Sequence, residues 1–201
     1  MTTNQAVQAD PRPLLLAAAA QVTTYVDRVR LDDLDRPTPC AGWTVRDLLS
    51  HLVAVSVRVP HVLRGGHPFE VPSQVEGVAD RDWAGAWAER QPELVAALGE
   101  DAVLERTVHH PAGDMPAAAA IVTYVSELVT HGWDLAAALG DTSGLDDALA
   151  ATCLAPLQGA LPAGIRDEDR VPFGAVVPVP DDAPALDRLL GWVGRDPRWT
   201  P

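Results

Sequence analysis

The fold is decided by the stretch PCAGWTVRDLLSHL, residues 39–52, which predicts a loop that turns into an amphipathic helix. Pro39 disfavours helix, and Thr44 followed three residues later by Asp47 resembles a capping box in which Asp replaces the usual Glu. Beyond the cap, apolar residues recur at helical spacing. The buried stripe that they predict comprises Val45, Leu48, Leu49, Leu52, Val55 and Val59. His51 lies at the margin of this stripe, so one ligand-type side chain is expected beside the core.

A second stretch, SELVTHGWDL at residues 126–135, carries two more ligand-type side chains. Glu127 and His131 are four residues apart and therefore project from the same helical face. The helix around them is largely apolar, so an ionised carboxylate there is costly unless a cation or an Arg pairs with it. With His51, the pair makes up a candidate three-ligand metal site that leaves room for an exogenous ligand. Imidazole and carboxylate ligands suit zinc, nickel or ferrous iron better than calcium.

Outward from these stretches, apolar periodicity predicts an all-α protein. Residues 1–12 are expected to be disordered, 13–165 to form a helical bundle, and 166–201 to form an extended segment and a short helix packed on the bundle. Pro92 should kink or split the third helix, and Gly140 should end the fourth. The helices are expected at about 13–30, from 44 to the Gly pair at 65–66, 80–98, 116–139, from 143 onward, and 184–193.

The composition restricts the class of protein. The 201 residues fit one large domain or one domain with a tail, and the net charge of −13 argues against nucleic acid and anionic membrane surfaces. Two cysteines cannot build a disulfide framework, which favours a reducing compartment. The apolar run at 14–20 is far shorter than the roughly 20 residues of a membrane span and lacks a basic segment before it. We therefore expect a cytoplasmic protein with neither nucleic-acid nor membrane partners.

Four residues close to the ligand-type side chains have two interpretations each. Asp134 can orient a ligand histidine or make an ordinary polar helix contact. Trp43 and Trp133 can wall the site or simply pack in the core. Arg46 can contact an anionic substrate or lie on a solvated helix face.

The remaining cysteines and histidines are weaker candidates. Cys40, in the loop before the second helix, can be a reactive thiol, but an inert loop thiol is favoured, and Cys153 lies on an apolar helical face. His109 and His110 fall in the stretch 101–117, which should be irregular or weakly extended around a turn at 111–114. Adjacent residues of an extended segment point to opposite faces, so these two histidines should not chelate together.

The combination PTPCAGWTVRDLLSHL (37–52) and ELVTHGWDLA (127–136) resembles the mycothiol-dependent maleylpyruvate isomerase family, which belongs to the DinB-like metal-binding four-helix bundles. The stretches VPVPDDAP (177–184), DRLL (187–190) and GRDPRW (194–199) resemble an actinobacterial branch of that family. The resemblance extends over residues 13–199.

The resemblance implies an up-down bundle in which His51, Glu127 and His131 hold a divalent metal, most often zinc. It also implies mycothiol as a cosubstrate, bound to the metal as thiolate for attack on a small electrophile, as in a thiol transferase or isomerase. The founding enzyme carries a separate C-terminal domain, and residues 166–201 are too few for one. The isomerase substrate is therefore not carried over.

Two other functional interpretations stay open. The protein can be a non-catalytic metal- or ligand-binding module, such as a sensor or stress protein, or the three ligand-type residues can be a metal-free structural cluster. A homodimer paired through helix faces is also open, and no residue in the sequence specifies the interface.

Overall fold

A computed structural model describes residues 10–166 and 173–201 of the chain. Its helices are α1 (Arg12–Val26), α2 (Val45–Leu63), α3 (Trp83–Ala88), α4 (Gln91–Leu98), α5 (Ala117–Leu139), α6 (Asp147–Ala160) and α7 (Ala185–Trp192). The strands are β1 (Thr107–Val108) and β2 (Met115–Pro116), which pair antiparallel. The predicted all-α class is confirmed, since this short hairpin is the only sheet in the described part of the chain.

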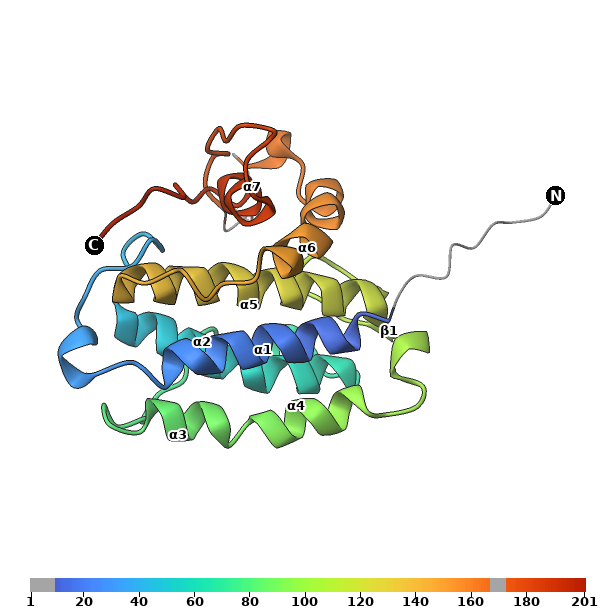
Figure 1. The fold of residues 1–201 in the computed structure, drawn as a ribbon. Helices are drawn as coiled ribbons and strands as arrows, with labels where there is room; N and C mark the ends of the chain where they lie inside the picture. The colour runs from blue at the N-terminus through green and yellow to red at the C-terminus, as the bar shows by residue number, and fades with distance from the viewer. Residues whose placement is uncertain (1–9, 167–172) are drawn as a thin grey trace.

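α1, α2 and α5 pack together with the α3–α4 pair and form a helical bundle (Figure 1). α1 packs between α5 and α3, while α2 packs against α5, α4 and α3, so the consecutive α3 and α4 together take the place of one long helix. α6 and α7 lie on the outer side of α5, opposite α3 and α4. Within the described residues, no helix is both long and apolar enough to cross a membrane.

The two helices that carry the ligand-type residues begin and end where the sequence predicts. Thr44 caps α2: its hydroxyl accepts from the Asp47 amide at 3.3 Å, and the Asp47 carboxylate accepts from the Thr44 amide at 2.9 Å. This pair is a capping box with Asp in the third position. α5 stops at Gly140, whose φ of 81° lies in the left-handed region that terminates many helices.

Several other boundaries differ from the sequence-based expectation. α1 ends at Val26 rather than near residue 30, because the amides of Arg28 and Val29 bond three residues back instead of four. The third predicted helix is split before Pro92, which occupies the first turn of α4, where its missing N–H costs no helical bond. α6 begins at Asp147 rather than at residue 143, because Asp146 caps it by accepting from the Ala148 amide at 2.8 Å.

The ends of the chain are only partly described. Of the segment 1–12 that was expected to be disordered, residues 1–9 lie outside the described residues, and Arg12 already belongs to α1. The expected extended segment at 171–180 begins outside them, and its part from 173 onward has no regular secondary structure.

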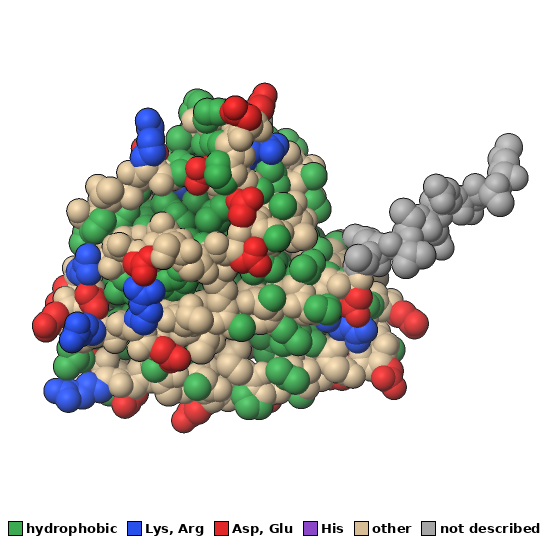
Figure 2. All heavy atoms as spheres, in the orientation of Figure 1, with side chains coloured by type: hydrophobic (Ala, Val, Ile, Leu, Met, Phe, Trp, Pro, Cys, Tyr) green, Lys and Arg blue, Asp and Glu red, His purple; other side chains and the backbone are tan. Residues whose placement is uncertain are grey.

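The surface is mixed in character. On the face drawn in Figure 2, acidic and basic side chains are interspersed over the bundle, and apolar side chains gather in the region of α6 and α7. The interior is apolar and close-packed, with α1, α2 and α5 contributing most of its fully buried side chains. This packing fixes the mutual position of α2 and α5, and therefore of the residues that project between them.

We expect Thr44→Ala to lower the free energy of unfolding by about 1 kcal/mol, because it removes the acceptor that caps α2. Urea denaturation followed by circular dichroism measures the change. Thr24→Ala, at an exposed position inside α1, is the matched control and should change stability by less than about 0.5 kcal/mol. Equal unfolding midpoints for Thr44→Ala and the unmodified protein would contradict the capping role.

Asp141, between α5 and α6, should make stability depend on pH in the acid range. Hydrogen bonds from Ser143 and Arg28 lower the pKa of its carboxyl from 3.8 to about 2. Because the folded-state pKa is depressed, this stabilisation is present above pH 3.8 and is lost as the pH falls toward 2. Asp141→Asn should therefore be less stable than the unmodified protein at neutral pH and converge with it near pH 2 in urea titrations. Asp182→Asn, at an exposed position, is the control.

Candidate metal centre

The structure brings the three ligand-type residues together between α2 and α5. His51, in the second turn of α2, places Nε2 3.0 Å from Oε1 of Glu127, and His131, one turn further along α5, places Nε2 3.7 Å from the same oxygen. One ligand atom from each residue lies within 4.8 Å of the other two, which is close enough for one ion to contact all three. We call these three residues the triad.

The orientation of His51 is set by the main chain of the loop at residues 68–75. Its Nδ1 lies 2.7 Å from the carbonyl oxygen of Ser73. A carbonyl only accepts, so Nδ1 carries the proton and donates, and in the neutral ring Nε2 is left with its lone pair. That lone pair is directed toward Glu127.

His131 is oriented in the same way by a side chain. Its Nδ1 lies 2.9 Å from Oδ2 of Asp134, whose side chain is fully buried. Asp134 is itself held by Arg195, which donates from Nε and Nη2 to the two carboxylate oxygens at 2.9 and 3.0 Å. Since the paired carboxylate accepts, Nδ1 of His131 also carries the proton, and its Nε2 lone pair faces Glu127.

This geometry directs two imidazole lone pairs and one carboxylate oxygen to a common point, which is repulsive unless positive charge lies there. Burial pushes the pKa of Glu127 upward, but the two histidines outweigh it and bring this pKa down to about 2. Burial pushes the pKa of His131 downward, but its hydrogen bond to Asp134 and the charge of Glu127 raise it overall. Positive charge between these three groups would relieve their mutual repulsion.

The Trp43 side chain lies against the two imidazole rings of the triad. The Trp43 ring lies 5.0 Å from the His51 ring and stacks on the His131 ring at 6.1 Å with an interplanar angle of 13°. Trp133 does not contribute to this wall, because it packs with Ala137 and Leu190 in a separate apolar cluster. Of the two tryptophans considered from sequence, the structure brings only Trp43 to the triad.

Arg46 is engaged with two carboxylates near the start of α2. Its guanidinium forms ion pairs with Asp35 and Asp80. These ion pairs agree with the interpretation of Arg46 as part of a solvated helix face.

Cys40 lies close to the triad without belonging to it. It forms a second, overlapping donor group with His131 and Asp134, but both oxygens of Asp134 are already bonded to Arg195. Burial raises the pKa of the Cys40 thiol to about 11, which disfavours the reactive thiolate. Cys153 is buried in the core between α5 and α6, as expected from its apolar face.

The two adjacent histidines of the β-hairpin, His109 and His110, have hydrogen-bond partners of their own. His109 is exposed and bonds to Asp114 at 2.7 Å. His110 accepts at Nδ1 from the Ala112 amide and therefore donates from Nε2 to the Thr123 hydroxyl at 2.9 Å. Its two ring nitrogens are thus satisfied, and it serves the packing of the hairpin on α5.

Three residues around the triad, Arg195, Arg58 and Tyr124, carry no local sequence pattern that predicts their place there. Arg195 lay in a tail stretch quoted only for its resemblance to a family, and nothing in its spacing pointed to Asp134. Arg58 of α2 donates to the carbonyls of residues 68, 71 and 72, and thereby holds the loop that contains Ser73. Tyr124, one turn before Glu127, has a buried hydroxyl with no hydrogen-bond partner among the described residues.

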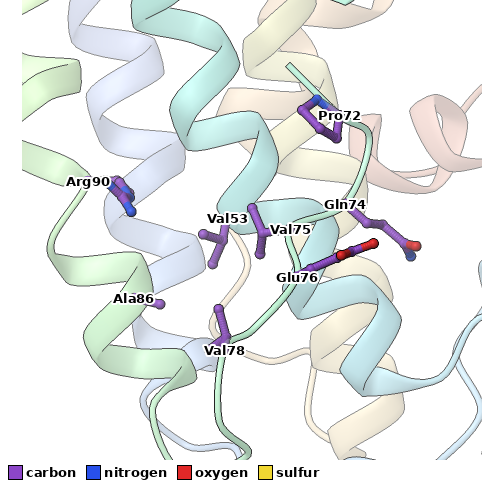
Figure 3. A pocket seen from close by; sticks show the side chains of 8 residues that line it. All are labelled: Val53, Pro72, Gln74, Val75, Glu76, Val78, Ala86 and Arg90. Atoms are coloured by element: carbon purple, nitrogen blue, oxygen red, sulfur yellow. The ribbon is translucent and has the colours of Figure 1, made fainter. Parts of the chain in front are cut away.

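A groove of about 430 Å³ runs between α2, α3 and the chain at residues 72–78 (Figure 3). Val53, Val75, Val78 and Ala86 make most of its lining apolar, with Glu76 and Arg90 at the edges. None of the triad residues lines it, so it is a different feature of the surface.

Comparison with known proteins identifies the family of the chain. The family model described as the mycothiol maleylpyruvate isomerase N-terminal domain matches residues 15–136, which include the whole triad and more than half of the chain. The chain belongs to this family. The matched range ends within α5, so α6 and α7 lie beyond it.

Relatives and solved structures extend the comparison. Uncharacterized proteins from two strains of Mycobacterium tuberculosis are 32% identical to this family member over 188 residues, which covers 92% of its chain and 99% of theirs. Crystal structures of the mycothiol-dependent maleylpyruvate isomerase and of a mutant of it match with a TM-score of 0.60. They are 15% and 14% identical and cover 83% of this chain and 72% of theirs, so this likeness establishes the fold.

We expect Arg58→Met to loosen the loop at residues 68–75, because it removes three hydrogen bonds to loop carbonyls. Hydrogen–deuterium exchange should become faster across this loop, including at the Val75 amide that bonds to Ser50, and stay unchanged in α6. Arg28→Met, which removes an exposed arginine at the far end of α1, is the control. Unchanged exchange in the loop would show that Arg58 does not hold it.

Proposed function

We propose that this protein binds one divalent metal ion through His51, Glu127 and His131 and uses a small-molecule thiol, with mycothiol as the candidate, in a transferase or isomerase reaction on a small electrophile. The single observation that carries the proposal is the convergence of two imidazole Nε2 atoms and one carboxylate oxygen on a common point. The family of the chain supports the thiol.

The donor set fits a metal better than a proton. Both Nδ1 atoms are committed, one to the Ser73 carbonyl and the other to the buried Asp134 carboxylate, so each Nε2 is oriented as a ligand. This arrangement of an outer hydrogen-bond acceptor behind a ligating imidazole is the usual support of metal-bound histidine. Two imidazoles and a carboxylate favour zinc, with nickel and ferrous iron as other candidates.

Three protein ligands leave coordination positions for an exogenous group. A divalent metal held by these residues would lower the pKa of a bound thiol and so would supply a thiolate nucleophile. Glu127 has the most exposed side chain of the triad, at 29%, so a small molecule reaches the site from its side. Trp43 covers the imidazole rings and restricts the access of water.

The proposed activity requires the residues of the chain to do three things. Ser73 and Asp134 keep the proton of each histidine on Nδ1, so that neither ring has to change tautomer when a metal binds. Glu127 supplies the negative charge that partly neutralises a divalent ion. Tyr124, buried one turn away on α5, offers a hydroxyl donor that no described residue uses.

The first test is the metal content of the protein. We expect about one zinc per chain after reconstitution, and loss of that zinc in the His51→Ala/His131→Ala double variant. His67→Ala/His109→Ala, which removes two exposed histidines whose rings neighbour each other away from the triad, is the matched control and should keep the metal. Elemental analysis of gel-filtered protein measures the stoichiometry, and full occupancy in the triad variant would refute the ligand assignment.

A second measurement separates a thiol-dependent enzyme from a non-catalytic metal-binding module. Cobalt-substituted protein should develop a thiolate-to-cobalt charge-transfer band on addition of a small thiol such as mycothiol or cysteine. Appearance of the band, together with thiol consumption in the presence of a small electrophile, supports the proposed reaction class. Metal binding without either signal identifies the binding module instead.

A further inference from the structure

A tight turn at Gly194 ends α7 and directs the following residues back toward α5. The Gly194 amide bonds to the Gly191 carbonyl and the Arg195 amide bonds to the Leu190 carbonyl, which together close α7 in a left-handed turn. Gly194 has a φ of +84°, and a Cβ there would lie 3.0 Å from the backbone of Gly174. Only glycine fits this turn without strain, and the turn directs the next side chain toward the bundle.

That next side chain, Arg195, makes a two-point contact with Asp134 of α5. Nε donates to Oδ1 at 2.9 Å and Nη2 donates to Oδ2 at 3.0 Å, which is the fork geometry that arginine forms best with a carboxylate. Asp134 has no exposed surface, and Arg195 is only 14% exposed. Asp134 Oδ2 also accepts from Nδ1 of His131, so the three side chains form one continuous hydrogen-bonded chain.

We propose that Arg195 is a positioning residue of the metal centre, acting through Asp134 to hold His131 with its proton on Nδ1 and its Nε2 toward Glu127. This inference rests on the proposed function. Without Arg195, the buried Asp134 carboxylate loses the two hydrogen bonds that fix its plane and is free to turn away from Nδ1 of His131. The guanidinium prevents this rotation and leaves one lone-pair direction of Oδ2 for the imidazole.

The proposal makes the C-terminal segment a part of the site. Arg195 lies outside the range 15–136 that the family model matches, whereas Asp134 and His131 lie inside it. Leu190 of α7 packs on Trp133 and Ala137, which are the neighbours of Asp134 along α5. The apolar contact therefore docks α7 next to the residue that Arg195 must reach.

The test compares Arg195→Met, Arg195→Lys and the control Arg198→Met, whose side chain is 88% exposed. In chelator competition, zinc affinity should fall ten- to hundredfold in Arg195→Met. Zinc affinity should be partly recovered in Arg195→Lys, which keeps the positive charge but cannot donate two parallel hydrogen bonds, and should be unchanged in Arg198→Met. In metal-free protein, ¹⁵N NMR of the imidazoles should find His131 protonated on Nδ1, and Arg195→Met should shift it toward a mixture of tautomers.

The inference is overturned if folded Arg195→Met binds zinc within twofold of the unmodified protein, or if the tautomer of His131 does not change. If Arg195→Met does not fold, the double variant Asp134→Asn/Arg195→Met is used in its place, because it also removes the unpaired buried charge. Zinc affinity equal to that of Asp134→Asn alone supports action through Asp134, and a further loss overturns it. Absence of zinc binding in the unmodified protein refutes the proposed function, and the tautomer measurement then decides the role of Arg195 separately.

Discussion

Two imidazole Nε2 atoms and one carboxylate oxygen meet at a single point between α2 and α5, and the rest of the structure serves this convergence. Without positive charge at that point the groups repel each other, because both rings carry their proton on the far nitrogen. The packing of α2 on α5 brings the three residues together, and Trp43 covers them. The preference of this site for a cation thus depends on the orientation of the two imidazole rings as well as on the types of the three residues.

That orientation depends on parts of the chain that are remote from the triad in sequence. The loop at 68–75 supplies the Ser73 carbonyl and is itself held by Arg58, while the segment after α7 supplies Arg195. In each case a fixed hydrogen-bond acceptor, the Ser73 carbonyl for His51 and the Asp134 carboxylate for His131, keeps the proton of the imidazole on Nδ1. The Arg195–Asp134 pair also ties α7 to α5, since removing one partner leaves the other charge buried and uncompensated, at a cost of about 3–5 kcal/mol.

The helices divide into a bundle that the family model matches and an outer pair, α6 and α7, that lies beyond the matched range. The bundle of α1 to α5 lies almost wholly within the matched family range of 15–136, and its fold is shared with solved maleylpyruvate isomerase structures. α6 and α7 cover the outer side of α5, and the relatives in Mycobacterium tuberculosis align over 92% of the chain. The segment after α7 carries Arg195, which contacts Asp134 of α5 and so connects the outer helices to the triad.

The sequence alone determined the local elements: the capping box at Thr44, the stop of α5 at Gly140, the break before Pro92, and the shared face of Glu127 and His131. These depend on hydrogen bonds and spacings within a few residues, which periodicity and turn chemistry report directly. Only the tertiary structure decided that His51 faces that pair, that Arg46 turns to surface carboxylates, and that Arg195 reaches across 61 positions to Asp134. Such contacts depend on which helix faces pack together and on the path of the connecting loops, and no local pattern encodes either.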